Sequence, residues 1–255
     1  MGEAVDDQDA VAAAAIFAAR AESNVGFTSH DVEPIKNQWL PTMLVTQATL
    51  GEHTLGASAN AEMLADMFAT RDQVLYSRTP TRVTASTQLE MAAEMGRWQG
   101  RWLDADGASQ GKSGVYFAQW RLQPGSTLWL LNAEVFVPVA PAPSTGDVAA
   151  EAAIRTARAS SNAAIKAHDI DGIAAHWLPD VHVTHSNGSI LSGAAANREM
   201  FAESFAAHAD LSFDRRTETV LLDVDTAGGV AAELGTCVFD SDLIQLIQIV
   251  AWDKI

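Results

Sequence analysis

The sequence predicts an α+β protein built from two similar domains, each with helices followed by a long antiparallel sheet. Three observations lead to this fold class. An internal repeat relates residues 9–137 to residues 147–255. Each copy begins with an alanine-rich segment of helical length, and each continues with runs in which apolar and polar residues alternate, as they do in strands.

Composition limits the classes of function. The chain has 255 residues, enough for two domains near the usual size of roughly 100–150 residues. Its 16 basic and 32 acidic residues give a net charge of −16, which argues against nucleic-acid and anionic-membrane partners because both bind clustered cations. The single Cys237 excludes an internal disulfide framework and a site of several thiolates. The N-terminus is acidic and no apolar run approaches roughly 18 residues, so we expect a cytoplasmic protein without a membrane span.

The repeat is clearest where residues 20–46 align with residues 158–184, because 12 of the 27 positions carry the same residue. Two copies of this length indicate two domains rather than a solenoid of short units. Between the copies, the segment VPVAPAPSTG contains three prolines and almost no charge. We therefore expect residues 138–146 to be a semi-rigid linker.

Helices are predicted at the start of each copy. The segments 9–28 and 147–166 have helical length, and Asp147 is positioned to cap the second of them. A short second helix follows in each copy and is expected to end at the motif Trp-Leu-Pro, because proline cannot continue a helix. Asp31 and Asp169 stand where each short helix needs an acceptor for its first N–H groups.

Strands dominate the rest of each copy. After Trp-Leu-Pro, an alternating run and a hairpin return precede a third helix, at 59–71 in the first copy and 195–208 in the second. The remainder of the first copy is predicted to be all strand, at residues 73–79, 83–90, 92–103, 112–122 and 127–137. The second copy has only 15 residues after Asp240, so we expect its sheet to lack the final strand.

This order of elements, with the segments LYSRTP, AAEMGRWQGRW, GKSGVYFAQWR and WLLNAEVFVP, resembles the nuclear transport factor 2-like superfamily and, within it, a bacterial SnoaL-like subfamily. The resemblance covers residues 9–137 and 147–240. It implies a cystatin-like fold, in which a curved sheet wraps a long helix into a cone with a pocket at the open end. It also implies that sheets pair through their outer faces, so we expect an intramolecular pseudo-dimer, with homo-oligomers as a further option.

The resemblance says less about chemistry. The superfamily includes ketosteroid isomerases, so an enzyme of this kind would be a cofactor-independent isomerase, dehydratase or cyclase. Dehydratase-like members carry a histidine on the strand after the third helix, but that strand offers Leu75, Tyr76 and Arg78 here. No catalytic residue of the superfamily is carried over to this chain, and no cofactor is expected.

Two charged residues stand among apolar ones in the predicted strands of the first copy. Period-two alternation places Arg78 in register with core positions, and it places Glu94 on one face with Trp98. A buried charge is costly unless it is paired. We therefore expect Arg78 to face Glu94 across the sheet interior, and Arg215 to face Glu233 in the second copy.

Two interpretations of Glu94 remain open. As a general base in an apolar pocket, it would have a pKa raised toward neutrality by burial, and Arg78 would hold a substrate oxygen. As half of a structural ion pair, it would fix strand register and be a poor base, because an adjacent arginine lowers the pKa of a carboxyl group. The residues expected to line a ligand site are Tyr76, Arg78, Trp98, Trp120, Glu134, Arg215 and Glu233.

The second copy also contains four clustered histidines, at positions 168, 176, 182 and 185. Leu44 stands in the first copy where His182 stands in the second, and leucine cannot bind a metal, so the two copies do not share a metal site. A site in the second copy alone stays open, but no nearby carboxylate or thiolate stands at a familiar ligand spacing, so we expect no metal. His30 and His168 each precede a capping aspartate and are expected to be turn residues. His182 lies on an alternating strand and is the candidate acid or base of the second copy.

Three functions are compatible with these features. The first is binding of a small apolar molecule in the cone of the first domain. The second is a lyase or isomerase that abstracts a proton next to a carbonyl group through Glu94 or His182. The third is a structural or assembly module, which a pocket smaller than roughly 300 Å³ would favour.

Overall fold

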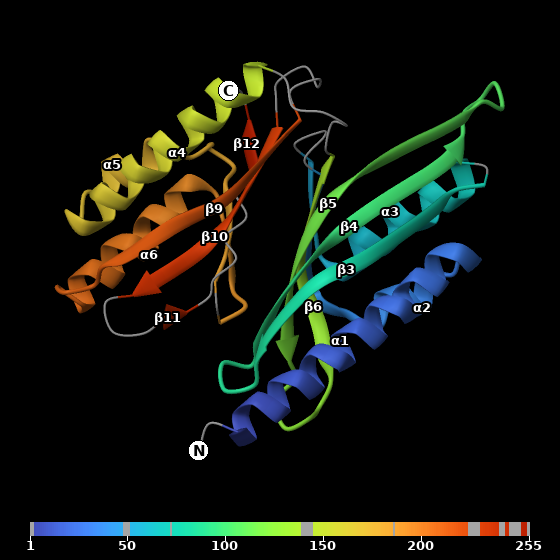
Figure 1. The fold of residues 1–255 in the computed structure, drawn as a ribbon, viewed down its shortest axis with the longest axis horizontal. Helices are drawn as coiled ribbons and strands as arrows, with labels where there is room; N and C mark the ends of the chain where they lie inside the picture. The colour runs from blue at the N-terminus through green and yellow to red at the C-terminus, as the bar shows by residue number, and fades with distance from the viewer. Residues whose placement is uncertain are drawn as a thin grey trace. The chain divides into compact units, whose positions relative to one another are not determined.

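The computed structural model describes residues 3–47, 52–71, 73–138, 145–185, 187–223, 230–239, 243–244 and 251–253. The chain divides into two compact units, Met1–Val139 and Ala140–Ile255, here named domain 1 and domain 2. Most of the predicted linker lies outside the described residues. Each domain consists of helices followed by antiparallel strands, which confirms the predicted α+β fold class (Figure 1).

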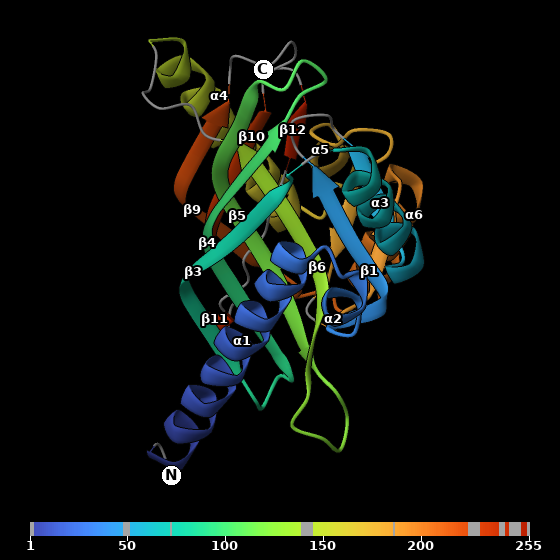
Figure 2. The same cartoon turned by 90° about the vertical axis from the view of Figure 1, so that its right-hand side faces the viewer.

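Domain 1 is a six-stranded sheet with a long helix across one face. Its elements, within the described residues, are α1 (Glu3–Ser29), α2 (Val32–Lys36), β1 (Trp39–Gln47), β2 (Glu52–Leu55), α3 (Ala57–Thr70), β3 (Leu75–Ser86), β4 (Met91–Leu103), β5 (Ser109–Leu122) and β6 (Trp129–Pro138). The strand order is β2-β1-β6-β5-β4-β3, with β1 and β6 parallel and the other neighbours antiparallel. Figure 2 shows α1 lying across the curved sheet.

Domain 2 begins in the same way and ends differently. Its described elements are α4 (Thr145–Lys166), α5 (Ile170–Ala174), β7 (His182–Thr184), β8 (Ile190–Ser192), α6 (Ala194–Ala207), β9 (Phe213–Asp223), β10 (Val230–Phe239), β11 (Leu243–Ile244) and β12 (Ala251–Asp253). Strand β10 pairs with β9, β11 and β12. In the part of domain 2 that the structure describes, no long strand corresponds to β6.

The long helices bury matching faces. The inward residues of α1, which are 0–7% exposed, are Ala12, Ile16, Arg20, Ser23 and Phe27. The inward residues of α4, which are 0–6% exposed, are Ala150, Ile154, Arg158, Ser161 and Ile165. Each set follows the spacing of three and four residues that defines one helical face. In both helices, an arginine and a serine therefore enter the interior among apolar side chains.

The turns that precede the short helices have the predicted form. Asp31 accepts a hydrogen bond from the N–H of Glu33, and Asp169 accepts one from the N–H of Gly172. His30 has a φ of +54° and His168 a φ of +52°, in the left-handed region that short turns use. This confirms that both histidines are turn residues.

Two expected boundaries are wrong, and both involve proline. The short helix α2 ends at Lys36, well before Trp-Leu-Pro, and β1 runs through Pro41. The β1–β6 register shifts between Trp39 and Leu44, so the ladder is already interrupted where Pro41 has no N–H to donate. Similarly, the two strands expected at 73–79 and 83–90 are one strand, β3, with an irregularity between Pro80 and Arg82.

Candidate functional site

A buried carboxylate with four hydrogen-bond donors stands at the centre of domain 1. Glu94 lies on β4 and is 0% exposed. It accepts hydrogen bonds from Arg20 Nε at 2.9 Å and from Arg20 Nη2 at 2.8 Å. Trp120 Nε1 donates to it at 2.7 Å, and the Tyr116 hydroxyl donates a fourth bond. Because donors occupy both oxygens, little capacity remains for a substrate.

Side chains of alternating charge extend the contacts of Glu94 into a buried network. Arg20 Nη1 lies 3.0 Å from Glu134 Oε1, and Arg78 Nη1 lies 3.2 Å from Glu134 Oε2. Arg78 Nη2 donates to Ser23 Oγ at 2.5 Å, and its guanidinium carbon lies 4.6 Å from the ring centre of Phe27. Two cations and two anions are buried together, and each charge gains a partner that offsets its removal from water. The domain 1 clamp consists of Arg20, Arg78, Glu94 and Glu134.

The predicted pairing of Arg78 with Glu94 is wrong. In the β3–β4 register, Glu94 stands opposite Val83 and Arg78 stands opposite Trp98. The direct partner of Glu94 is Arg20, which comes from α1. Alternation along a strand indicates which face a charge occupies, but the partner here belongs to the helix that covers this face.

A motif that we did not use in the sequence analysis contains this partner. Arg-Ala-X-Ser-Asn occurs at residues 20–24 and again at residues 158–162. Its spacing places the arginine, serine and asparagine near one another on the helix surface. In α1, Asn24 Nδ2 donates to the carbonyl of Arg78 at 2.7 Å and Asn24 Oδ1 accepts from its N–H at 3.0 Å. The asparagine thus satisfies the free edge of β3, as a neighbouring strand would.

Domain 2 repeats this arrangement with one carboxylate. Arg158 Nη2 donates to Glu233 at 2.7 Å, and Arg158 Nε donates to it at 2.9 Å. Arg215 Nη2 donates to Ser161 Oγ at 2.6 Å, and Asn162 Nδ2 donates to the carbonyl of Arg215 at 2.8 Å. The predicted pairing of Arg215 with Glu233 is therefore also wrong, for the same reason. The domain 2 clamp consists of Arg158, Arg215 and Glu233.

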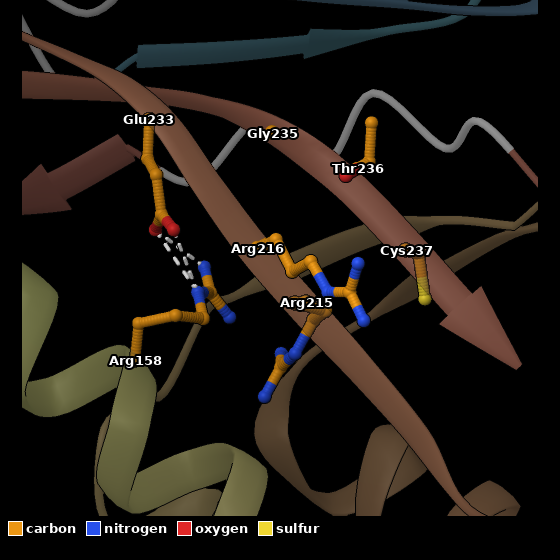
Figure 3. A pocket seen from close by; sticks show the side chains of 7 residues that line it. All are labelled: Arg158, Arg215, Arg216, Glu233, Gly235, Thr236 and Cys237. Carbon is orange, nitrogen blue, oxygen red and sulfur yellow. Dashed lines mark hydrogen bonds and ion pairs between the residues drawn. The ribbon is translucent and has the colours of Figure 1, made fainter.

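A small cavity lies beside the domain 2 clamp. Its lining residues are Arg158, Arg215, Arg216, Glu233, Gly235, Thr236 and Cys237. Figure 3 shows Arg158 reaching from α4 to Glu233 on β10. The cavity volume of about 10 Å³ has room for about one water molecule, far below the roughly 300 Å³ of small ligand sites.

The clamps have perturbed protonation equilibria. Burial acts to raise the pKa of Glu94, but the charge of Arg20 and the donors around the carboxylate outweigh it, so the pKa lies below its usual value. Burial and the charge of Arg20 lower the pKa of Arg78 to about 10, against the opposing effect of Glu134. In domain 2, burial and the charge of Arg158 lower the pKa of Arg215 to about 9. Glu94 therefore stays ionised near neutral pH, and its pKa is not raised in the way that the general-base interpretation requires.

Aromatic rings cover the concave face of the sheet next to the domain 1 clamp. Tyr76 and Trp98 are stacked with ring centres 6.3 Å apart, and Trp98 meets Phe136 edge-on at 5.9 Å. A Cβ atom at Gly100 would lie 2.4 Å from Tyr76 Cε1, so the glycine lets this ring lie against β4. Phe68 on α3 packs against the apolar core of the domain and meets Phe27 edge-on at 5.9 Å, and Phe27 in turn contacts Tyr76. The aromatic surface consists of Phe68, Tyr76, Trp98 and Phe136.

Solvent reaches one ring of this surface at an unexpected place. Phe136 lies on β6, a central strand between β1 and β5, and it contacts Trp98 and Tyr116 on the concave side. Trp98 is 7% exposed and Tyr116 is 0% exposed, yet Phe136 is only half-buried. Phe136 is therefore less buried than the two rings that it contacts on this face.

The structure groups the predicted site residues in three places. Trp120, Glu94, Arg78 and Glu134 meet in the domain 1 clamp, with Tyr76 and Trp98 on the adjoining aromatic surface. Arg215 and Glu233 belong to domain 2. His182 lies apart from these, on the short strand β7, where its Nδ1 is 2.8 Å from Ser192 Oγ. The catalytic roles of Glu94 and His182 and the ligand-binding roles of the other residues stay predictions.

Among the described residues, no group of three His, Cys, Asp or Glu side chains is arranged to hold a metal ion. In the same part of the chain, none of the helices has the length and apolar character needed to span a bilayer.

Comparison with known proteins gives matches among solved structures. No protein-family model and no curated protein matches the sequence. A nuclear transport factor 2-like superfamily protein from Salmonella enterica is 15% identical, covers 53% of this chain and 96% of its own, and has a TM-score of 0.46. A ketosteroid isomerase-like protein from Erwinia carotovora atroseptica is 16% identical over 51% of this chain and 97% of its own, with a TM-score of 0.43. A protein with a cystatin-like fold from Caulobacter vibrioides is 12% identical over 55% of this chain and 96% of its own, with a TM-score of 0.44.

These solved structures carry the superfamily and fold names that the sequence analysis had reached from its own segments. Each match covers about half of this chain.

Proposed function

We propose that domain 1 binds a small apolar molecule on the aromatic surface and that it does so without acid–base catalysis. The observation that carries the proposal is the half-buried ring of Phe136 on the concave side of a central strand. A ring in a filled core at this position would be buried, as its neighbour Tyr116 is. Aromatic side chains offer large apolar area at a low cost in conformational entropy, and they suit a flat apolar ligand.

The state of the carboxylates opposes a lyase or isomerase function. A general base needs an accessible lone pair and a pKa near the working pH. Glu94 has neither, because four donors occupy its oxygens and its pKa is lowered. Glu134 lies between two guanidinium groups. These contacts favour binding over catalysis in domain 1.

For domain 2 we propose a structural role. Its described interior has a clamp like that of domain 1, and the cavity beside this clamp has room for about one water molecule. The intramolecular pairing of the two sheets and the cytoplasmic location stay predictions from the sequence.

Binding can be tested with the neutral fluorescent probe N-phenyl-1-naphthylamine and the full-length chain. We expect a saturable rise in probe emission, and we expect Phe136→Leu to weaken binding about threefold or more, because a buried aromatic contact is worth roughly 1 kcal/mol. The matched control is Phe17→Leu, which changes an exposed ring on α1 and should leave the affinity unchanged. Absence of saturable binding, or equal affinities for both variants and the parent chain, would overturn the proposal.

A further inference from the structure

Two cations stand at the rim of the aromatic surface. Arg71 directly follows α3, and its guanidinium carbon lies 5.2 Å from the ring centre of Trp102. Burial raises the pKa of Tyr76, and the charge of Arg71 opposes this rise. Lys112 stands opposite Gly100 in the β4–β5 register, and cross-strand partners share a face of the sheet. Both cations are exposed.

These cations differ from the arginines of the domain 1 clamp. Within the described residues, neither Arg71 nor Lys112 forms a salt bridge with a carboxylate. The carboxylate of the neighbouring β4–β5 turn, Asp104, accepts hydrogen bonds from the Ala108 N–H at 2.8 Å and from Gln110 Nε2 at 2.7 Å. It is thus engaged within its own turn. Among the described residues, Arg71 and Lys112 therefore place two positive charges beside the aromatic surface, in a chain whose net charge is −16.

We infer that the molecule bound by domain 1 is an amphipathic organic anion, whose apolar body lies on the aromatic surface and whose acidic group lies at Arg71. Lys112 adds a second positive charge on the same face. The inference rests on the proposed function and adds the chemical class of the ligand. It is supported by the geometry of Arg71, because its guanidinium lies over the Trp102 ring, next to the aromatic surface on the same face of β4. A guanidinium held in place loses little further freedom when it binds a carboxylate or sulfonate.

The size of the expected effect follows from exposure. Arg71 is exposed, so its pairing with an anion is a surface interaction, which changes affinity by about fivefold at most when it stands alone. Such an interaction is screened by salt, whereas apolar contact is not. The anionic part of the affinity is therefore separable from the apolar part.

The test uses two probes that share one apolar body. 8-Anilinonaphthalene-1-sulfonate carries a sulfonate that N-phenyl-1-naphthylamine lacks. We expect Arg71→Met to weaken binding of the sulfonate probe about threefold to fivefold and to leave binding of the neutral probe unchanged. Arg71→Lys should retain part of the affinity for the sulfonate probe. Added salt should weaken binding of the sulfonate probe only. The matched control is Arg97→Met, because Arg97 is exposed on β4 at a position that alternates with the concave residues Gly96 and Trp98.

The possible outcomes separate this inference from the proposed function. One outcome is that the neutral probe binds and its affinity depends on Phe136, but Arg71→Met changes the affinity for neither probe or for both equally. In that case the anionic ligand class is overturned and the apolar site stands. If neither probe binds saturably, both proposals are overturned. Equal losses in Arg71→Met and Arg97→Met would indicate a general effect of charge and would also overturn the assignment to Arg71.

Discussion

Substitution of Glu94 by glutamine tests how much the buried carboxylate contributes to the stability of the fold. In Glu94→Gln, the new amide NH₂ group would lie against hydrogen-bond donors such as Arg20 Nε. Arg20 would also keep only Glu134 as an ionic partner. Breaking a buried pair leaves an uncompensated charge, so we expect the free energy of unfolding to fall by about 3 kcal/mol in urea titrations. In Glu33→Gln, the exposed contact with Lys36 at 3.9 Å is lost, and the change should stay below about 1 kcal/mol. Unchanged stability in Glu94→Gln, together with loss of a catalysed reaction, would restore the role of general base.

The protonation of Glu94 gives a second prediction at the residue scale. Its pKa is lower in the folded chain than the ordinary value of 4.5, since Arg20 and the other donors outweigh burial. A group of this kind stabilises the fold above its unfolded pKa, and that stabilisation disappears as the pH falls through its folded pKa. Between about pH 5 and about pH 3, the free energy of unfolding of the parent chain should therefore fall more steeply than that of Glu94→Gln. Parallel pH profiles for the two proteins would contradict the lowered pKa.

At the scale of elements, one asparagine joins helix α1 to strand β3. Asn24 makes two hydrogen bonds to the backbone of Arg78, so Asn24→Ala should cost about 2 kcal/mol, roughly 1 kcal/mol for each bond. Hydrogen exchange should show faster exchange at the amide of Arg78, whose acceptor is removed. Thr28→Ala is the control, because Thr28 Oγ1 bonds only within the exposed turn of α1, to the carbonyl of Asn24. An unchanged exchange rate at Arg78 would mean that the edge of β3 is protected in another way.

The elements were predictable from local pattern, whereas the contacts between them were not. The third helix was expected at 59–71 and is observed at Ala57–Thr70, since its apolar spacing and the preceding glycine are local signals. The single strand β3 was expected as two, because Pro80 reads as an interruption and only the partner strand shows the pairing resuming at Arg82. The position of Glu94 on the concave face follows from alternation. Its partner Arg20 does not, because that contact depends on how α1 is rotated over a curved sheet.

At the scale of the whole chain, the two halves have the same clamp residues on the long helix and differ in the clamp residues on the strands. Arg-Ala-X-Ser-Asn is present in both copies, so both long helices have the same means of binding their sheets. Domain 1 adds Glu134 from β6, and the described part of domain 2 offers no such strand. The similarity between the two halves of the sequence could not show which half carries the aromatic surface. Phe136 of the aromatic surface lies on β6, for which the described part of domain 2 has no counterpart.

Each domain has its own clamp and its own apolar core. We therefore expect the unfolding of each domain to respond to substitutions in its own clamp. Each unit has its own apolar cluster, around Trp98 in domain 1 and around Phe201 in domain 2. In urea titrations of the full chain, Glu94→Gln should shift the transition seen by tryptophan fluorescence, since five of the seven tryptophans lie in domain 1. Glu233→Gln should leave most of that transition in place and should shift a second transition, seen by far-ultraviolet circular dichroism. The reason is that loss of a buried charge destabilises the core that contains it. A single transition, coincident in both signals and shifted equally by both variants, would mean that the two halves unfold as one cooperative unit.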